Sequence, residues 1–356
     1  MSIYDSGLWL EDIDTVSAAL PWLEELDGSS VLITGAGGLI CSAVADLLIC
    51  YNERNRGHIR ILAAGRSEKR VLERFGRFAG RPYFSYVPYD STVAVLRLDE
   101  KADFIIHGAG NASPDRIMRE PVETMMNSFT GLLGLLEYGA KNGTERLLFI
   151  SSSEIYGKKE GTEPYKAGEY GYIDLLDPRS SYSVGKRAAE TLCCSFSHEY
   201  GLDTVIVRPG HIYGPTASVT DSRVSSQWPY AAARGERIVM KSDGSHIRSY
   251  CYCLDCASAI LTVLIKGERG HAYNISNPDS VISIKRMAEI LVKSAGVELK
   301  AELPTEKELK GFNPMINSSL DATELLNLGW RGCFDAESGF AHTVQILKES
   351  LKCLKR

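Results

Sequence analysis

The chain has 356 residues, of which 44% are hydrophobic and 24% charged, which suits a globular protein with a sizeable core and a two-part architecture. Forty basic and 45 acidic residues leave a net charge of −5 without a run of Lys or Arg, which argues against a broad nucleic-acid or lipid surface. The N-terminus lacks the basic start and apolar run of a signal peptide, so we expect no membrane segment and a cytoplasmic location.

Residues 1–28 form a partly amphipathic N-terminal extension. Its apolar side chains could pack against the rest of the protein, and they are Leu8, Trp9, Leu20, Trp22 and Leu23.

From residue 29 onward, apolar β-rich runs alternate with stretches of helical periodicity. Strands are predicted over residues 29–37, 58–65, 83–90, 102–110, 145–153 and 202–210, and helices over 39–53, 122–143 and 181–201. The predicted fold class is therefore α/β, a Rossmann-type doubly wound parallel sheet over residues 29–214 that includes returning segments from the C-terminal part.

After residue 214 the alternation loosens, and residues 215–356 are predicted to form mainly a smaller C-terminal α/β substrate-binding lobe. Within it, residues 280–296 predict a helix with Ser283 as N-cap and Gly296 as its stop.

The chain has nine cysteines, and those in "CYCLDC" (251–256) are a candidate metal site. Cys251 and Cys253 alternate as inward positions on a strand would, and no second Cys/His pair stands at ligand spacing. We expect buried core cysteines and no metal.

A glycine-rich turn follows the first predicted strand in "VLITGAGGLICS" and contains Gly35, Gly37 and Gly38. Glycines at this place allow a tight turn and let the backbone approach a pyrophosphate at the helix N-terminus. Their position in a βαβ series predicts dinucleotide binding. The third glycine of the usual pattern is replaced by Cys41, so the helix is expected to sit slightly further from the strand.

The end of the second strand, "ILAAGRS", lacks the acidic residue that normally binds the adenosine ribose. Arg66 and Ser67 stand there instead and could receive a 2′-phosphate. Arg66 could equally cover the adenine, so the cofactor is NAD or NADP and the sequence leaves the choice open.

Tyr182 and Lys186 are four residues apart at the start of a predicted helix and project from one face. A tyrosine with its ordinary pKa of about 10 is a poor base at neutral pH. A lysine cation beside it, together with an oxidised nicotinamide, favours the phenolate. Ser152, at the end of the preceding strand, would bind the same substrate oxygen. These three residues predict a hydride-transfer site.

With these motifs the sequence resembles the extended short-chain dehydrogenase/reductases of the NAD-dependent epimerase/dehydratase family, in the nucleotide-sugar branch. The resemblance runs from about residue 29 to 345 and includes "TGAGGLI", "HGAGNAS", "SSSEIYG", "YSVGK", "VRPGHIYGP" and "GSHIRSYCYCLD". It implies a homodimer formed through a four-helix interface by the helices around 115–140 and 183–200. It also implies cofactor contacts at Gly35, Gly37, Gly38, Leu39, Ile40, Asp90, Ala109, Arg208 and Pro209.

Ser153 and Glu154 distinguish among members of this family. Dehydratases carry Asp–Glu at these two positions, and Ser153 would be a poor proton donor, whereas UDP-glucuronate decarboxylases resemble the chain in having Ser–Glu. In that interpretation, oxidation at C4 lets the C5 carboxylate leave as CO2, and Glu154 and Arg248 manage the proton at C5. Arg223 and Arg248 would contact carboxylate or diphosphate, and Ser113, Ser153 and His211 are further substrate-binding candidates.

Two departures from the decarboxylase pattern weaken this assignment. Arg116 and Ile117 replace an aromatic residue after "NASP", and His211 stands where an asparagine usually contacts the sugar nucleotide. These changes indicate a pocket altered around the sugar or phosphate, which leaves open a different acidic sugar or a nucleotide other than uridine. A nucleotide-sugar epimerase acting through a 4-keto intermediate is an alternative, because it needs only removal and return of a hydride. A non-catalytic NAD(P)-binding regulator is a third, and it predicts a degraded Ser/Tyr/Lys set, which this sequence does not have.

Overall fold

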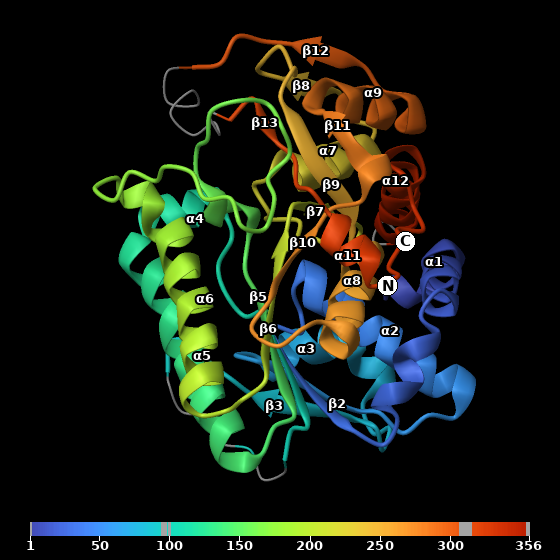
Figure 1. Cartoon of the computed structure of the whole chain (residues 1–356). Coiled ribbons are helices and arrows are strands. Elements are labelled where there is room, and N and C mark those ends of the chain that lie inside the picture. The colour runs from blue at the N-terminus through green and yellow to red at the C-terminus, as the bar shows by residue number, and fades with distance from the viewer. Residues whose placement is uncertain (1, 94–97, 99–100, 306–314, 354–356) are drawn as a thin grey trace.

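The computed structural model describes residues 2–93, 98, 101–305 and 315–353. Its centre is a sheet of seven parallel strands in the order β10-β6-β5-β4-β1-β2-β3 (Figure 1). The strands are β1 (Ser30–Thr34), β2 (Arg60–Gly65), β3 (Phe84–Pro88), β4 (Phe104–His107), β5 (Arg146–Ile150), β6 (Thr204–Pro209) and β10 (Ala272–Ile275). The sequence order reverses between β1 and β4, as in a doubly wound dinucleotide-binding fold. The predicted fold class is confirmed.

Helices cover both faces of this sheet because alternate residues of each strand point to opposite sides. On β1, Val31 and Ile33 pack with one layer, whereas Leu32 packs with the other. The first layer contains α2 (Leu39–Asn55), α3 (Glu68–Phe75) and α8 (Cys253–Lys266). The second layer contains α5 (Pro121–Asn142) and α6 (Ser181–Glu199), which pack side by side along the sheet (Figure 1).

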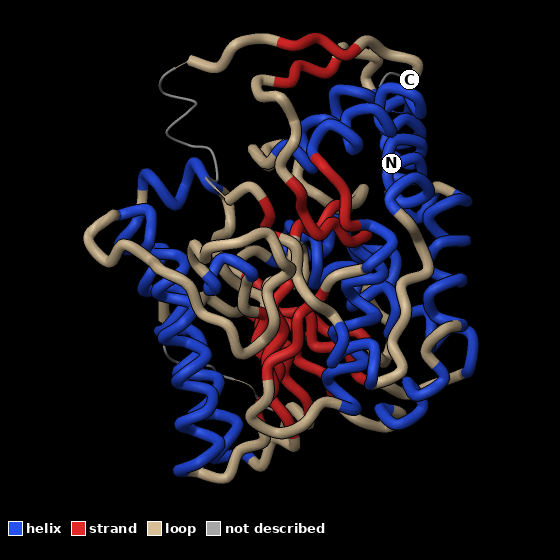
Figure 2. The backbone as a smooth tube through the Cα atoms, turned by 45° about the horizontal axis from the view of Figure 1, so that its top comes forward, coloured by secondary structure: helices blue, strands red, loops and turns tan. Residues whose placement is uncertain are grey.

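A smaller group of strands and helices lies beyond the carboxyl end of the sheet (Figure 2). Its central strand is β9 (Ile247–Tyr252), which pairs with β7 (His211–Tyr213), β11 (Val281–Ser283) and β13 (Asn317–Ser318). A two-stranded pair, β8 (Ile238–Met240) and β12 (Leu299–Ala301), lies beside it. The helices of this part are α7 (Val224–Ala233), α9 (Ile284–Ala295), α11 (Thr323–Asn327) and α12 (Ala336–Cys353).

The N-terminal residues fold onto the first helix layer. Helix α1 (Gly7–Ala18) packs against α2, α8 and α12, and Trp9 and Leu23 are completely buried there. Buried polar contacts add to this packing: Asp12 accepts a hydrogen bond from the Tyr252 hydroxyl at 2.8 Å and pairs with His342 Nδ1 at 2.8 Å.

Several local predictions can be compared with the structure. Helix α9 has Ser283 as its N-cap, with the side chain accepting from the Arg286 N–H, and it ends at Gly296 in the left-handed region. The strand prediction for "CYCLDC" is wrong in part, because β9 ends at Tyr252 and Cys253 already begins α8. All three of its cysteines are nonetheless buried.

In the described residues, no helix is long and apolar enough to cross a membrane. Within the same ranges, no group of three or more His, Cys, Asp or Glu side chains could hold a metal ion.

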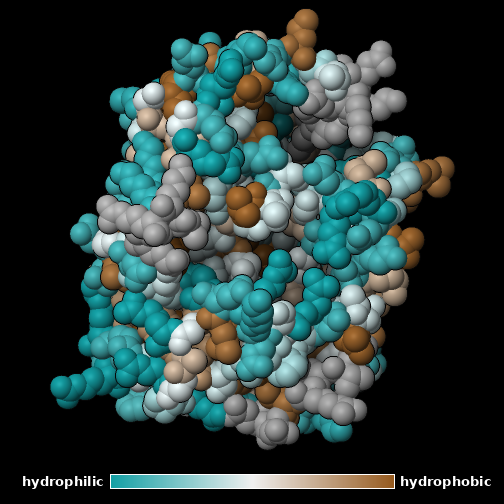
Figure 3. All heavy atoms as spheres, turned by 180° about the vertical axis from the view of Figure 1, so that it is seen from behind, coloured by the Kyte–Doolittle hydropathy of each residue, from teal (hydrophilic) through white to brown (hydrophobic). Residues whose placement is uncertain are grey.

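Apolar side chains remain exposed on α4 (Pro114–Arg119) and α5. They protrude from the edge of the molecule where these helices lie, as the view from behind shows (Figure 3). They are Met118, Val122, Met125, Met126 and Phe129, with exposed fractions between 37% and 68%. This stripe lies within one of the two segments for which the resemblance implies a dimer interface.

Candidate active site

The glycine-rich turn lies at the carboxyl end of β1, where the strand order reverses. Gly35 has a φ of +73°, and a Cβ at this position would come within 3.0 Å of the backbone of Ala109. Gly38 is the N-cap of α2 and offers no side chain to its first turn. The first N–H groups of a helix have no acceptor inside the helix and attract anions. The turn therefore fits a pyrophosphate, with Leu39 and Ile40 as the first helical residues.

Cys41 is accommodated differently from the prediction. A Cβ at Gly108 would lie only 2.3 Å from the Cys41 sulfur, so this sulfur occupies the room that a side chain at residue 108 would need. The third glycine of the usual pattern is thus replaced by a cysteine on α2 and a glycine after β4. The expected outward shift of the helix is not required.

The adenine end of the site leaves the cofactor choice open. Arg66 is exposed after β2, and the Ser67 hydroxyl caps α3 by accepting from the Arg70 N–H at 3.3 Å. Asp90 accepts hydrogen bonds from the N–H and the hydroxyl of Thr92, both at 2.9 Å. These contacts, with the Arg66 charge, lower the pKa of Asp90. No acidic residue ends β2, as the sequence indicated.

Tyr182 lies in the first turn of α6 and is almost completely buried, with the Ser152 side chain close enough to lower the pKa of its hydroxyl. Burial and the charge of Glu154 raise its pKa to about 12, whereas Ser152, Arg223 and Arg179 act in the opposite direction. The structure thus brings together the predicted Ser/Tyr pair and two arginines. Without further positive charge, a smaller fraction of this tyrosine is ionised to phenolate at neutral pH than of a free one.

Lys186 lies one turn further along α6, buried beneath Tyr182. Its ammonium donates to the carbonyl oxygen of Ile150 at 2.8 Å and lies 6.0 Å from the centre of the Tyr182 ring. Burial lowers the pKa of Lys186 to about 8, and Glu190 opposes that shift. After burial, the charges that act most on the pKa of Tyr182 are those of Glu154, Arg223 and Arg179.

Glu154 is held by an arginine that the sequence analysis missed. Its two carboxylate oxygens pair with Arg179 at 3.0 and 3.1 Å, and both side chains are about one-third exposed. Arg179 lies in a 3-10 turn capped by Asp177, three residues before Tyr182. This spacing places it on the catalytic side of α6, a signal that the sequence offered in "DPRSSY".

Arg223 and Ser113 lie on neighbouring segments, because the Ser113 hydroxyl contacts the residue before Arg223. Arg223 makes a bidentate pair with Asp221, at 3.0 Å from Nε to Oδ1 and 2.5 Å from Nη2 to Oδ2, which lowers the pKa of Asp221 although burial opposes it. The Ser113 hydroxyl is 3.3 Å from that of Ser222. The charge of Arg223 also lowers the pKa of Tyr182, so Arg223 lies near the catalytic tyrosine.

His211 and Arg248 lie in the smaller part of the molecule. His211 begins β7, and burial together with the charges of Arg248 and Arg223 lowers its pKa to about 3. Its Nδ1 atom is buried without a hydrogen-bond partner in the described residues. Arg248 is buried on β9 and donates to the carbonyl oxygens of Ile247 and Met315 at 2.8 and 3.0 Å.

Arg208 does not have the free guanidinium expected of a cofactor contact. It makes a bidentate pair with Glu190 and donates to the Tyr156 and Tyr170 hydroxyls and to the Ala167 carbonyl. These contacts use all five of its N–H donors. Arg208 thus fastens the loop after residue 157 to the sheet. Pro209 follows at the end of β6, and Ser153 begins the 3-10 turn that carries Glu154.

The family of the chain follows from its similarity to known proteins. A model described as the NAD dependent epimerase/dehydratase family matches residues 31–276. The chain belongs to this family.

Curated members of the epimerase/dehydratase family are similar over most of the chain. UDP-glucuronic acid decarboxylase 1 of Xenopus tropicalis is 28% identical over 337 residues, 93% of this chain and 75% of that protein. UDP-glucuronic acid decarboxylase 6 of Arabidopsis thaliana is 29% identical over 302 residues, 84% of this chain and 83% of that protein. A trifunctional UDP-glucose 4,6-dehydratase, epimerase and reductase of Arabidopsis thaliana is 30% identical over 323 residues, 88% of this chain and 46% of that protein.

Solved structures of epimerases and dehydratases have the same fold. UDP-glucose 4-epimerase of Thermotoga maritima, with UDP-glucose, superposes with a TM-score of 0.75 at 22% identity, covering 90% of this chain and 99% of that one. dTDP-glucose 4,6-dehydratase of Bacillus anthracis, in complex with NAD, gives a TM-score of 0.75 at 18% identity, covering 91% and 98%.

Proposed function

We propose that the protein is a nucleotide-sugar enzyme that uses NAD or NADP to oxidise the sugar transiently at C4 and decarboxylates a UDP-hexuronate, UDP-glucuronate, to a UDP-pentose. The observation that carries this proposal is the charge arrangement of the site, in which Arg179 and Arg223 are each paired with a carboxylate, whereas Arg248 has none among its partners in the described residues. That uncompensated cation suits an anionic sugar nucleotide. The similarity to UDP-glucuronic acid decarboxylases supports the same choice.

The dinucleotide would be held by the turn after β1, where the first N–H groups of α2 have no side-chain cap and Gly37 faces open space. Asp90 and Ala109 would contact its adenine and ribose side. When bound, the cofactor accepts a hydride from C4 and later returns it, so the complete cycle is redox-neutral.

Tyr182 takes the proton of the sugar 4-hydroxyl, and Ser152 binds the same oxygen. Because the protein's own groups raise the pKa of Tyr182 to about 12, its phenolate depends on positive charge in the assembled site. Lys186 supports this state from below the ring, with its ammonium anchored at Ile150.

At C5, loss of CO2 leaves the electron pair of the broken bond in the enolate of the 4-ketone, and a proton must then reach C5. Glu154 and Arg248 are the groups proposed to manage that proton. Arg179 and Arg223 provide positive charge for the sugar carboxylate or the diphosphate, and His211 contributes a neutral imidazole because burial lowers its pKa to about 3.

A second candidate is a nucleotide-sugar epimerase. The pairing of Glu154 with Arg179 favours it, because a carboxylate neutralised in this way leaves Ser152, Tyr182 and Lys186 as the active set. Removal and return of a hydride at C4 require no group beyond these three. Release of CO2 separates the two functions.

We also propose a homodimer in which α4 and α5, with their exposed apolar stripe, and α6 form a four-helix interface. A second copy would cover Met118, Val122 and their neighbours, which otherwise face water. A cytoplasmic location remains a prediction.

The deciding experiment is incubation of the purified protein with UDP-glucuronate and NAD, and separately with NADP, while CO2 release and reduced-nicotinamide absorbance are measured. We expect CO2 without lasting reduced cofactor. CO2 with accumulating reduced cofactor would mean that the reaction stops at the ketone. No CO2 with either cofactor would exclude UDP-glucuronate decarboxylation.

A further inference from the structure

The guanidinium of Arg248 is positioned by main-chain carbonyls. Its Nη1 atom donates to the carbonyl oxygens of Ile247 at 2.8 Å, Met315 at 3.0 Å and Ile316 at 3.4 Å, and Nη2 lies 3.2 Å from His246 Nδ1. No carboxylate is among these partners in the described part of the chain. The course of the backbone at residues 315–316 therefore decides where this buried charge lies.

Met315 and Ile316 directly precede a short strand. β13 (Asn317–Ser318) pairs with β9 at only two positions, Ile247 and Arg248. Two ladder positions provide little restraint, so other contacts must fix residues 315–321.

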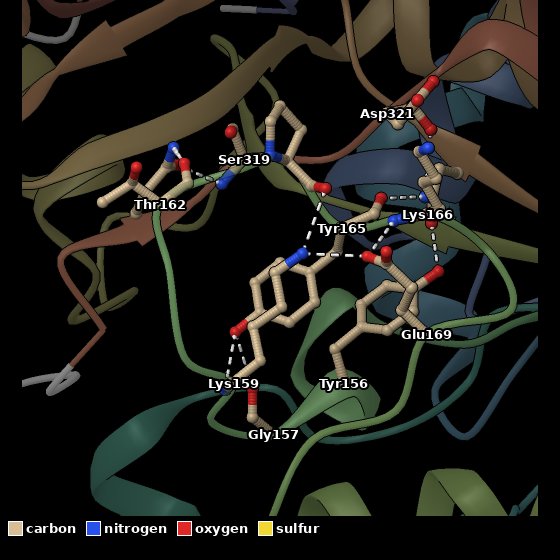
Figure 4. Close-up of polar contacts among 12 residues, drawn as sticks. Tyr156, Gly157, Lys159, Thr162, Tyr165, Lys166, Glu169, Ser319 and Asp321 are labelled. Atoms are coloured by element: carbon tan, nitrogen blue, oxygen red, sulfur yellow. Dashed lines mark hydrogen bonds and ion pairs between the residues drawn. The ribbon is translucent and has the colours of Figure 1, made fainter.

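Tyr165 provides these contacts from the loop that follows the Glu154 turn (Figure 4). Its N–H donates to the Ser319 carbonyl at 2.8 Å, and its carbonyl accepts from the Asp321 N–H at 2.9 Å. Its hydroxyl lies 3.1 Å from the Met315 sulfur. The Asn317 side chain adds a bond to the Thr162 carbonyl at 2.5 Å.

The other side of Tyr165 is tied to the Glu154 turn. Its hydroxyl donates to the Gly157 carbonyl at 2.9 Å and accepts from the Lys159 N–H at 3.3 Å. Its ring stacks on that of Tyr156, with centroids 5.1 Å apart, and the Lys159 ammonium lies 4.5 Å above it. Tyr156 belongs to the same 3-10 turn as Glu154, Ser153–Tyr156.

These residues form a small apolar core that is separate from the two large ones. Its buried members are Ile155, Tyr156, Tyr165 and Leu320, and Met315 packs against them. Tyr165 is only 2% exposed. This cluster joins the Glu154 turn to the segment that holds Arg248, and Asn274 of β10 ties both to the sheet through the Tyr156 hydroxyl and the Tyr165 and Asp321 carbonyls.

We propose that Tyr165 is a positioning residue that couples the turn carrying Glu154 to the backbone that seats Arg248. The inference rests on the proposed function, because it treats both groups as parts of the substrate site. Tyr165 touches neither reacting group itself and acts through Tyr156 and Gly157 on one side and Met315 on the other.

The test uses the full-length protein and the variants Tyr165→Phe and Tyr165→Leu. Phe keeps the ring and the backbone pairing but loses the hydroxyl contacts, whereas Leu also removes the stack. Tyr273→Phe is the matched control, since Tyr273 is 3% exposed and its hydroxyl accepts from the Glu268 N–H at 2.9 Å outside the site. The readouts are amide hydrogen exchange and affinity for UDP.

We expect amides in residues 157–172 and 315–321 to exchange about fivefold faster in Tyr165→Phe, as loss of about 1 kcal/mol of hydrogen bonding implies, and faster still in Tyr165→Leu. Affinity for UDP should fall about fivefold in Tyr165→Phe and remain unchanged in Tyr273→Phe. Unchanged exchange in residues 315–321 would overturn the inference.

Arg248→Ala separates this inference from the proposed function. If Arg248→Ala weakens UDP binding and Tyr165→Phe does not, the coupling by Tyr165 is refuted. If Arg248→Ala leaves UDP binding unchanged while exchange rises in Tyr165→Phe, the coupling of the two segments holds and the role of Arg248 in the proposed function fails.

Discussion

Glu154 and Arg179 are paired at both carboxylate oxygens, at 3.0 and 3.1 Å, and the two side chains act in opposite directions on Tyr182. Glu154 raises the pKa of the tyrosine and Arg179 lowers it. The pair therefore sets the basicity of the group proposed to start the reaction, although neither residue touches the 4-hydroxyl in that scheme.

Because of this pairing, replacing Glu154 and replacing Arg179 should shift the pH dependence of the oxidation rate in opposite directions. Oxidation at C4 requires the Tyr182 phenolate, so its rate rises with pH through the pKa of Tyr182. We expect Glu154→Gln to move this rise to lower pH and Arg179→Gln to move it to higher pH, each by on the order of one pH unit. Single-turnover formation of reduced nicotinamide measures this step without the later chemistry at C5.

The control is Glu199→Gln, at an exposed glutamate at the end of α6. This variant should not shift the pH dependence of the rate. Shifts of the same sign in the Glu154 and Arg179 variants would contradict this account of the site.

Replacing the proposed base gives a second prediction. Tyr182→Phe should reduce turnover by at least about a hundredfold, because Phe has no proton-accepting group, while the cofactor remains bound at the glycine-rich turn. Turnover and bound cofactor can be measured on the same sample. Tyr200→Phe, at an exposed tyrosine just beyond α6, should leave both unchanged. A fully active Tyr182→Phe enzyme would remove Tyr182 from the mechanism.

The sequence predicted the parallel sheet and the helix stop at Gly296 because periodicity and caps are local. It also predicted that Ser152, Tyr182 and Lys186 converge, because the carboxyl end of a strand and the start of the next helix must meet. The pairing of Glu154 with Arg179 was not predicted, since it depends on how a loop of more than 20 residues returns.

The contacts of Arg208 and Cys41 likewise could not be predicted from the sequence. The position of Arg208 near the cofactor, which the resemblance implies, stays a prediction, but the sequence did not indicate that its donors are used by Glu190 and by tyrosines of that loop. The consequence of Cys41 depended on Gly108, a residue 67 positions away that makes room for its sulfur. Such outcomes require knowledge of tertiary neighbours that no local pattern contains.

A third prediction concerns the stability of the fold. Asp255, on α8, is completely buried and accepts hydrogen bonds from the Cys333 and Phe334 N–H groups at 2.8 and 3.1 Å. Burial raises its pKa to about 7. Between an unfolded pKa near 4 and this value, the folded state keeps a proton that the unfolded state has lost. The stability contributed by this group is thus complete below about pH 4 and is lost as the pH rises to 7.

Urea unfolding at pH 5 and pH 7.5 tests this prediction with Asp255→Asn, which cannot ionise. The variant should be less stable at pH 5, because its amide cannot accept both N–H bonds. Its deficit relative to wild type should shrink by roughly 2 kcal/mol at pH 7.5, given about 1.4 kcal/mol per pH unit. The exposed Asp279→Asn should show a deficit independent of pH. A deficit in Asp255→Asn that does not change with pH would show that Asp255 has an ordinary pKa.

The last prediction concerns the apolar stripe on α5. Val122 and Met126 are 68% and 53% exposed and lie four residues apart on one helix face. If a second copy covers them, Val122→Glu and Met126→Glu bury a charge at the interface and should convert the dimer into a monomer, as measured by light scattering after size exclusion. Val219→Glu, at a 63% exposed valine in the loop before α7, adds the same charge and should remain dimeric. Because both stripe residues face away from the sheet, the monomers should keep the wild-type circular dichroism. A wild-type protein that is already monomeric at micromolar concentration would refute the proposed interface.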